Sequence, residues 1–409
     1  MSPVSNSNAT EILNLILETQ PIVDTHNDFP YLLRVQLRNE IECNKNFKFG
    51  ENLTSHTDLS KLRKGRVGVQ FFSCYIDCPE DNYAYSDFNL KNSMVRDTLE
   101  QIDVTGRLVN NFSSDLVFVQ TADDALAAYK SGKIAIALGI EGLHQVDTSL
   151  AVIRQYYKLG VRYATLTHTC DNPFATSSST VFHGKKDKGL SSYGESAVRE
   201  MNRLGMMVDL SHVSYNTAKR VLKISQAPVI FSHSSAYSLN SHERNVKDDV
   251  LMDVAKNGGV VQVNFFPDFI APKDGLRATI NDAVNHIFHI ANVAGWHCVG
   301  FGSDFDGIPY APSGLEDVSK YPDLIYKCIQ RGANSEQIEG LIGGNLFRVW
   351  KECEAVATKL QEKSEPIAEK EWQDRKWEVP ESAKEMSELY PGSKNLHDDS
   401  TSWKKKYFD

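Results

Sequence analysis

The stretch Tyr193–His212, YGESAVREMNRLGMMVDLSH, contains the unit on which the fold is built. Its first part, Tyr193–Leu204, is an amphipathic run with the spacing of a helix, and Gly205 follows where a left-handed turn ends many helices. The apolar run Met206–Leu210 then has the length of a buried strand, and His212 follows its end. A helix that leads through one glycine into a short buried strand is typical of parallel α/β folds.

The same unit recurs along the chain. Gly160 closes the helical run Ser149–Leu159 and also precedes a strand. Eight short apolar or β-branched runs are candidate strands: Ile22–Asp24, Val67–Ser73, Ile134–Gly139, Tyr163–Thr167, Met206–Leu210, Val229–Phe231, Val260–Asn264 and Cys298–Gly302. Eight βα units predict a closed (β/α)8 barrel of the TIM type, and no GxGxxG follows a strand to favour a dinucleotide-binding sheet.

The length and composition suit one catalytic domain. We expect residues 1–363 to form a single (β/α)8 domain. Residues 364–409 are rich in charge, Trp and Pro without a clear period, which predicts a C-terminal extension that packs on the barrel or frays from it. The net charge of −9 provides no basic surplus to neutralise phosphates, so nucleic acid is not an expected partner.

Targeting signals are not apparent in the sequence. No run reaches the ~18 apolar residues of a membrane-spanning helix. The first residues have no charged start and no cleavage pattern of a secretory signal, so we expect a cytoplasmic protein, or a secreted one if a leader precedes this sequence. The seven cysteines include no CxxC pair, so no zinc knuckle is expected.

Polar residues follow six of the eight candidate strands. They are His26 with Asp28, Glu141, His168, His212, His233 and Asp304. The carboxyl ends of barrel strands meet at one face, where the active sites of such enzymes lie. A solvated turn would explain the His-x-Asp pair alone, and a hydrogen-bonded core position would explain any one histidine. Their joint position at strand ends instead favours a metal centre.

The ligand types indicate the metal. Imidazoles and carboxylates without thiolates suit Zn²⁺, with Mn²⁺, Fe²⁺ or Co²⁺ as alternatives. A lone glutamate between two groups of ligands can bridge two ions ~3.5–4 Å apart, which hold a hydroxide and polarise a carbonyl oxygen. We assign Glu141 as this bridge, because the fourth strand ends in His168 and offers no lysine for carbamylation. The other histidines are expected to be surface or packing residues: His56, His144, His183, His242, His286, His289 and His297.

Longer motifs surround these residues. They include DTHND at Asp24–Asp28, GIEG at Gly139–Gly142, LTHTC at Leu166–Cys170, DLSHVS at Asp209–Ser214, IFSHSSAY at Ile230–Tyr237, RNV at Arg244–Val246 and GSDFDG at Gly302–Gly307. In this order they resemble the motifs of the membrane (renal-type) dipeptidases, the M19 metallopeptidases. The resemblance extends over roughly Ile22–Ala357 and implies a barrel of the metal-dependent amidohydrolase type.

The resemblance also implies a role for each site residue. His26 and Asp28 would hold one zinc ion, His212 and His233 a second, and Glu141 would bridge them. Beside the metals, His168 would stabilise the carbonyl oxygen of the scissile amide. Two further residues would bind the ends of the substrate: Arg244 its carboxylate, and Asp304 its amino group, with Asp304 also handling protons at the leaving nitrogen.

A zinc-dependent dipeptidase is therefore the expected function, with two Zn²⁺ per chain, a metal-bridging hydroxide, and substrates that include Cys-Gly units of glutathione conjugates. The alternatives are a non-peptide binuclear amidohydrolase, such as a deaminase or lactamase, and an inactive scaffold. Arg244 with Asp304 favours the dipeptidase, because a deaminase does not need to bind both ends of a zwitterion, and no metal ligand is missing to favour a scaffold.

The chain departs from the renal-type pattern at several points. Renal-type relatives are dimers, so we expect a homodimer. They also carry a secretory leader and a lipid anchor, neither of which is apparent in this sequence, so we expect no membrane attachment. Phe266 stands where the renal enzyme has a tyrosine, which removes a hydroxyl that faces the substrate. Cys78 and Cys170 match positions that form a disulfide in the secreted enzyme, but in a reducing cytosol we expect them to remain thiols.

Overall fold

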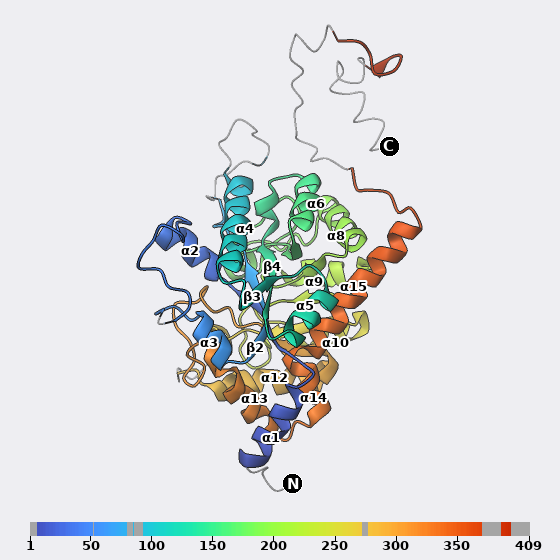
Figure 1. The fold of residues 1–409 in the computed structure, drawn as a ribbon. Helices are drawn as coiled ribbons and strands as arrows, with labels where there is room; N and C mark the ends of the chain where they lie inside the picture. The colour runs from blue at the N-terminus through green and yellow to red at the C-terminus, as the bar shows by residue number, and fades with distance from the viewer. Residues whose placement is uncertain are drawn as a thin grey trace.

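The computed structural model describes residues 6–51, 53–79, 85, 93–271, 277–369 and 386–393. Eight parallel strands form a nearly closed barrel surrounded by helices (Figure 1). In their order around the sheet they are β1 (Ile22–Asn27), β2 (Val67–Ser73), β4 (Ile134–Glu141), β5 (Val161–Thr165), β6 (Met207–Asp209), β7 (Val229–Phe231), β8 (Val260–Val263) and β9 (Val299–Phe301). The predicted (β/α)8 architecture is confirmed, and all eight strands coincide with predicted runs.

The helices follow the strands in the alternation that the sequence predicts. They are α1 (Asn6–Ile16), α2 (Phe29–Leu37), α3 (Leu59–Lys64), α4 (Met94–Asn111), α5 (Ala122–Lys130), α6 (Leu150–Lys158), α7 (Ser178–Phe182), α8 (Ser192–Leu204), α9 (Tyr215–Ile224), α10 (Asp248–Asn257), α11 (Pro267–Ile270), α12 (Ile280–Ala294), α13 (Tyr321–Gln330), α14 (Ser335–Glu339) and α15 (Asn345–Glu362). Short turns of helix occur at Leu143–Val146, Trp296–Cys298, Val318–Lys320 and Gly340–Gly344.

Helix α8 shows why the deciding stretch folds as it does. The Ser191 side chain accepts a hydrogen bond from the backbone N–H of Gly194 at the first turn of the helix. Gly205 ends the helix in the left-handed conformation, with φ of 85°, and its N–H bonds to Met201 and Asn202 carbonyls. The chain then enters β6, so the predicted succession of helix, glycine and strand is confirmed.

Closure of the barrel brings the first and last strands together. The backbone N–H of Asp304 donates to the carbonyl of His26 at 3.1 Å, and that of Asp28 donates to the carbonyl of Phe305 at 2.9 Å. These bonds lie just beyond the end of β9, at the carboxyl ends of the strands. They set residues that are almost 280 positions apart in the sequence side by side.

A ninth strand, β3 (Leu116–Phe118), was not predicted. It pairs in parallel with the first half of β4, on the side that β5 occupies further along that strand. It has only three residues and lies outside the order of the eight barrel strands, with β4 as its pairing partner.

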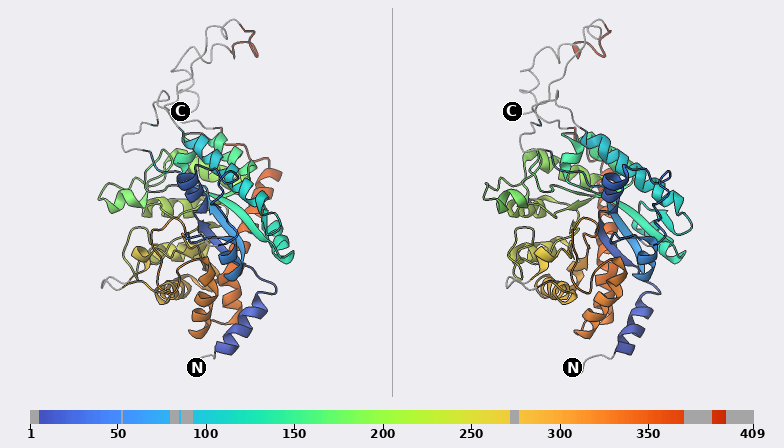
Figure 2. Two further views of the ribbon diagram at one scale, coloured as in Figure 1. Left: turned by 60° about the vertical axis from the view of Figure 1, so that its left-hand side comes forward. Right: turned by 90° about the vertical axis from the view of Figure 1, so that its left-hand side faces the viewer.

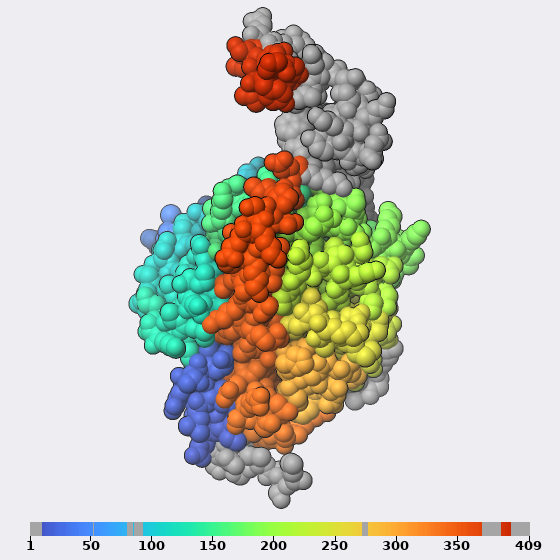
Figure 3. Space-filling model, turned by 90° about the vertical axis from the view of Figure 1, so that its right-hand side faces the viewer, coloured from blue at the N-terminus to red at the C-terminus, as the bar shows by residue number. Residues whose placement is uncertain are grey.

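The barrel interior is a packed core. Alternate residues of β4, Ala135, Ala137 and Glu141, share one face, and the two alanines pack in the same cluster as Tyr163 and Trp350. Trp350 belongs to α15, which crosses one side of the molecule between α5 and α8 (Figure 3). A second, larger cluster fills the space between the sheet and the outer helices.

The chain ends take different positions. The N-terminal helix α1 packs against α13 and α14, at the end of the molecule drawn lowest in Figure 2. After α15, the backbone of Ala368 bonds to Glu200 and Arg154, both at 3.1 Å, so the start of the predicted extension contacts the barrel. Most of residues 364–409 lie outside the described residues, and their division from the barrel stays a prediction. Among the described residues, no helix has the length and apolar character needed to cross a membrane.

Candidate active site

The side chains predicted to form a metal centre converge at the carboxyl ends of the strands. Their centre is the Oε1 atom of Glu141, the last residue of β4. Four imidazole Nε2 atoms approach this oxygen: those of His212 at 2.8 Å, His233 at 3.2 Å, His26 at 3.6 Å and His168 at 3.9 Å. Five residues from five different strands or strand ends therefore meet at one carboxylate.

Two aspartates adjoin this cluster on the His26 side. The Asp28 carboxylate lies 3.3 Å from His26 Nε2, and the ligand atoms of His26, Asp28 and Asp304 lie within 4.8 Å of one another. Asp304 and His212 have positive φ angles, 65° and 64°, which residues with a Cβ rarely adopt. Such backbone strain costs on the order of 1–3 kcal/mol and tends to occur at functional sites.

Hydrogen bonds orient two of the imidazoles. His233 Nδ1 lies 2.8 Å from the Ser232 hydroxyl, which itself donates to Asp209 at 2.6 Å. The Ser232 proton is therefore engaged, so His233 donates from Nδ1 and presents an Nε2 lone pair to the centre. His26 Nδ1 lies 2.8 Å from the Tyr163 hydroxyl, so its Nε2 also faces Glu141.

The donor set fits divalent cations. His26 Nε2 and Asp28 Oδ1 are buried and have no hydrogen-bond partner among the described residues. Buried polar atoms without a partner are uncommon. A cation between them would satisfy both, and imidazole with carboxylate ligands suits zinc and neighbouring transition metals.

Burial dominates the protonation of the site. Desolvation lowers the pKa of His168, His212 and His233 well below the usual range, which keeps these imidazoles neutral, the form that binds metals. Desolvation likewise raises the pKa of Glu141 well above its usual range. A bound cation would favour the carboxylate form of Glu141.

His26 and Asp304 show the electrostatic demand of the site. Burial works against a charge on His26, but the carboxylates of Asp28 and Glu141 outweigh it and raise its pKa to about 10. Burial raises the pKa of Asp304 to about 7, and the repulsion of Asp28 adds to this. A nearby positive charge would stabilise these carboxylates, and a divalent ion can supply it.

Arg244 lies at the edge of the cluster with hydrogen-bonding capacity to spare. Its side chain is buried, and Nη1 and Nη2 make only long bonds of 3.3 Å to Ser234 and to the carbonyl of His233. The Nε atom has no partner among the described residues, and the guanidinium lies 5.3 Å from the centre of the Phe269 ring. A buried guanidinium with free donors is suited to an anionic ligand.

Several residues of the site were not predicted. Tyr163, Ser232 and Asp209 orient the ligands, Asn264 donates to Asp304 at 2.7 Å, and the Tyr75 ring lies 4.5 Å from His168. Asp209 and Ser232 lie at strand ends, which is a signal that could have identified them. Phe266 stands where the renal-type pattern has a tyrosine, and its ring centroid lies 5.6 Å from that of Tyr310.

The expectation that Cys78 and Cys170 remain thiols was wrong, because the structure joins them in a disulfide. The strands β2 and β5 flank β4, so the loops that leave them converge and bring the two Cα atoms to 6.0 Å. Of the histidines expected to be surface or packing residues, His144 and His286 are fully buried.

Comparison with known proteins places this geometry in context. A family model described as membrane dipeptidase (peptidase family M19) matches residues 10–364. The chain is 64% identical to an uncharacterised dipeptidase of Schizosaccharomyces pombe over 384 residues, 93% of this chain and 92% of the relative. It is 42% identical to a dipeptidase of Aspergillus oryzae over 350 residues, 85% of this chain and 82% of the relative.

Solved structures share the fold at lower identity. A probable dipeptidase from Pseudomonas aeruginosa superposes with a TM-score of 0.73 at 21% identity, covering 86% of this chain and 100% of the other. A metallopeptidase from Rhodobacter sphaeroides, liganded with a phosphinate mimic of the dipeptide L-Ala-D-Ala, gives 0.68 at 23% identity, covering 82% and 99%. Both structures support the predicted (β/α)8 barrel fold.

Proposed function

Because the chain belongs to the membrane dipeptidase family, peptidase family M19, and is thus a metal-dependent peptide hydrolase, we propose that it is a zinc dipeptidase with two ions per chain. The observation that carries this proposal is the approach of four imidazole Nε2 atoms to one oxygen of Glu141. A carboxylate in that position can bridge two cations.

The metal ligands divide into two groups around this bridge. His26 and Asp28 would hold one ion, His212 and His233 the other, and Glu141 both. When bound, such a pair lowers the pKa of a water molecule and polarises the carbonyl of the scissile amide. The neighbouring His168 completes this environment, since its Nε2 faces the centre while Nδ1 lies 3.2 Å from the Thr169 hydroxyl. In this orientation it can donate a hydrogen bond to the carbonyl oxygen of the substrate.

The substrate would be held at its two ends. The spare donors of Arg244 would bind the terminal carboxylate, and the Asp304 carboxylate, fixed by Asn264, would bind the free amino group. In the reaction, water gives its hydroxyl to the acyl carbon, and the remaining proton passes through Asp304 to the leaving nitrogen. A positive and a negative group at a fixed separation select short zwitterions, which is the physical reason for proposing dipeptides.

Finer assignments rest on this proposal. Cys-Gly units of glutathione conjugates carry the same two end groups, so we include them among the proposed substrates. Both relatives with high identity are named dipeptidases, which supports the substrate class. The cytoplasmic location and the homodimer stay predictions.

The experiment that tests the proposal measures kcat/KM on free dipeptides, N-acetylated dipeptides, dipeptide amides and tripeptides. A charge-assisted hydrogen-bonded pair is worth roughly 1.5–3 kcal/mol, so loss of either end should reduce kcat/KM about tenfold or more. Arg244→Ala should raise KM for dipeptides. It should also narrow the difference in kcat/KM between dipeptides with a free carboxylate and dipeptide amides. Arg199→Ala, on the exposed surface of α8, is the matched control and should change neither.

The result that would contradict the proposal is also clear. If wild-type protein cleaves free, capped and longer peptides at equal rates, Arg244 and Asp304 do not bind the substrate ends. The site would then be assigned to a general amidohydrolase that does not recognise the ends of its substrate.

A further inference from the structure

We propose that Cys78, Cys170 and His144 form a second metal site, which opens when their disulfide is reduced and then binds a thiolate-preferring divalent ion such as Zn²⁺. None of these three residues belongs to the cluster around Glu141. The proposal therefore concerns a site outside the dipeptidase centre and does not depend on the substrate assigned to it.

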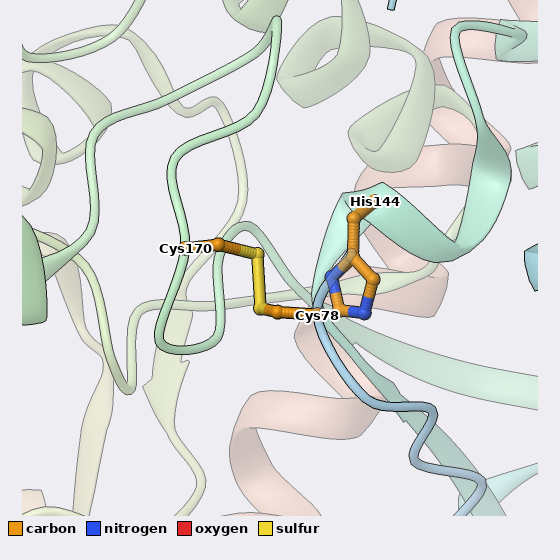
Figure 4. Close-up of side chains that lie close together, drawn as sticks. All are labelled: Cys78, His144 and Cys170. Carbon is orange, nitrogen blue, oxygen red and sulfur yellow. A yellow bond between two sulfur atoms is a disulfide. The ribbon is translucent and has the colours of Figure 1, made fainter. Parts of the chain in front are cut away.

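The three side chains are already assembled. The sulfur atoms of Cys78 and Cys170 and a ring nitrogen of His144 lie within 4.8 Å of one another. Figure 4 shows the imidazole of His144 beside the disulfide. Zinc binds thiolate sulfur at about 2.3 Å and imidazole nitrogen at about 2.0–2.1 Å, so a shift of the released thiolates is enough to surround an ion.

The state of His144 points to a ligand. Its Nε2 lies 2.8 Å from the carbonyl oxygen of Ile76, which can only accept, so Nε2 carries the proton and Nδ1 carries a lone pair. That Nδ1 atom is buried and has no hydrogen-bond partner among the described residues, and the whole residue is 0% exposed. A metal-binding histidine commonly has this arrangement, with one nitrogen held by a carbonyl and the other free to bind.

A packing role alone would leave this lone pair unsatisfied. A buried acceptor without a partner destabilises the fold, and an apolar side chain of similar shape would avoid this cost. Burial also lowers the pKa of His144 to about 4, so the ring is neutral and cannot use Nδ1 as a donor. A soft or borderline cation satisfies this lone pair, whereas the disulfide offers it no proton.

The redox step is a two-electron exchange. A dithiol reductant attacks the Cys78–Cys170 bond, its own two thiols become a disulfide, and their two protons and two electrons pass to the cysteines. Binding of the ion by two thiolates then releases those two protons to solvent. Both cysteines are only partly buried, so reductant and ion can reach them.

This site is connected to the proposed catalytic centre through one residue. The hydroxyl of Thr169 lies 3.6 Å from Cys78 Sγ and 3.2 Å from His168 Nδ1, and its single proton can be donated to only one of them. A change at the sulfur atoms therefore alters the partner that orients His168. Occupancy of the site should be detectable as a change in turnover as well as in metal content.

Cobalt(II) gives a readout that separates the two sites, because thiolate ligands produce a near-ultraviolet charge-transfer band and the cluster around Glu141 contains no thiolate. Full-length protein is reduced with a phosphine, freed of reductant under argon, and titrated with Co²⁺ or Zn²⁺. Oxidised protein is treated in parallel. Reduced wild-type protein should bind about one more ion per chain than oxidised protein, with the thiolate band, and reoxidation by diamide should release it.

The variants test each ligand. Cys78→Ser with Cys170→Ser should abolish the extra ion and the band. His144→Gln keeps a donor for the Ile76 carbonyl but has no imidazole, and should weaken binding of the extra ion at least about tenfold. Cys43→Ser removes an exposed thiol outside the cluster and should change nothing. Equal metal content in reduced and oxidised wild-type protein, a thiolate band that survives in the double cysteine variant, or an affinity for Co²⁺ in His144→Gln equal to that of the wild type would overturn the proposal.

Discussion

At the scale of single residues, the Glu141 carboxylate determines the charge balance of the site. Its Oε1 lies among four imidazole nitrogens, three of which burial keeps neutral. Its backbone N–H is fixed by Gln145 at 2.9 Å, so the side chain leaves β4 in a defined direction. Replacing one oxygen by an amide group would keep the shape and remove the negative charge.

Glu141→Gln should therefore keep the fold and lose most metal and activity, because a neutral amide is a poor ligand for two cations. Metal per chain from mass spectrometry and kcat on a dipeptide provide the measurement, with circular dichroism to check folding. Glu316→Gln, on the exposed surface, is the control. Near-normal metal content and turnover in Glu141→Gln would show that Glu141 does not bridge the ions.

His286 makes a prediction about pH. It is buried, its Nδ1 accepts a hydrogen bond from the N–H of Ala236 at 2.9 Å, and burial lowers its pKa from 6.5 to about 4. The unfolded chain takes up this proton as the pH falls through 6.5, whereas the folded protein resists until about 4. The unfolded state binds more protons in that interval, so stability decreases as the pH falls, by about 3 kcal/mol from this one group.

His286→Asn keeps an acceptor for Ala236 but does not titrate. The free energy of unfolding of this variant should fall less steeply between pH 6.5 and 4 than that of the wild type, as measured by urea denaturation at several pH values. His297→Asn, at an exposed position, should retain the wild-type slope. Identical slopes of unfolding free energy against pH in all three proteins would show that His286 does not cause this loss of stability.

At the scale of helices and strands, glycines mark where one element must give way to the next. Gly205 ends α8 with φ of 85°, in the region that disfavours a Cβ atom. Gly106 lies within α4, and a Cβ added there would meet no atom within 4 Å. Substitution by alanine should therefore have opposite effects on the stability of the protein at these two positions.

Gly205→Ala should destabilise the protein by about 1–2 kcal/mol because it forces alanine into a left-handed conformation. Gly106→Ala should stabilise it by roughly 0.5–1 kcal/mol through helix propensity. Thermal or urea unfolding measures both, and turnover of the remaining folded protein should be unchanged, since neither residue contacts the site. Effects of the same sign would contradict this account of the helix end.

The strands and ligands were predictable from sequence for a physical reason. Strands of a parallel barrel are buried on both faces, so they appear as apolar runs, and polar residues at their ends lie at one face. The orientation of the ligands was not predictable in this way. Tyr163 appears in the sequence as one more apolar strand residue, and only the three-dimensional arrangement brings its hydroxyl to His26. The disulfide depended similarly on the approach of two loops.

At the scale of the whole molecule, the barrel interior is packed with apolar side chains at one end and carries charged side chains at the other. Trp350 of α15 packs against Phe71 with ring centroids 5.2 Å apart, among the side chains of the barrel interior. At the opposite end lie the carboxylates of Asp28, Glu141 and Asp304, which repel one another in the absence of a cation. Metal binding should therefore stabilise the whole fold as well as activate it.

The purified protein should contain close to two divalent ions per chain, and chelation should abolish activity and lower the melting temperature. A ligand at about 100 times its Kd stabilises a protein by about 2.7 kcal/mol, so the shift should be several degrees. Added Zn²⁺ should restore both properties in parallel. A metal-free protein with full activity and an unchanged melting temperature would contradict the metal-dependent mechanism.

Barrel closure has a consequence for the newly made chain. Asp24 receives hydrogen bonds from Ser303 at 2.8 and 2.9 Å, and His26 accepts one from Asp304, so the first strand is completed only by the last. During translation, a chain that has not yet delivered residues 303–305 from the ribosome has an open edge beside β1 and an incomplete ligand cluster. Peptide hydrolysis therefore cannot begin before residues 303–305 have left the ribosome and paired with the first strand.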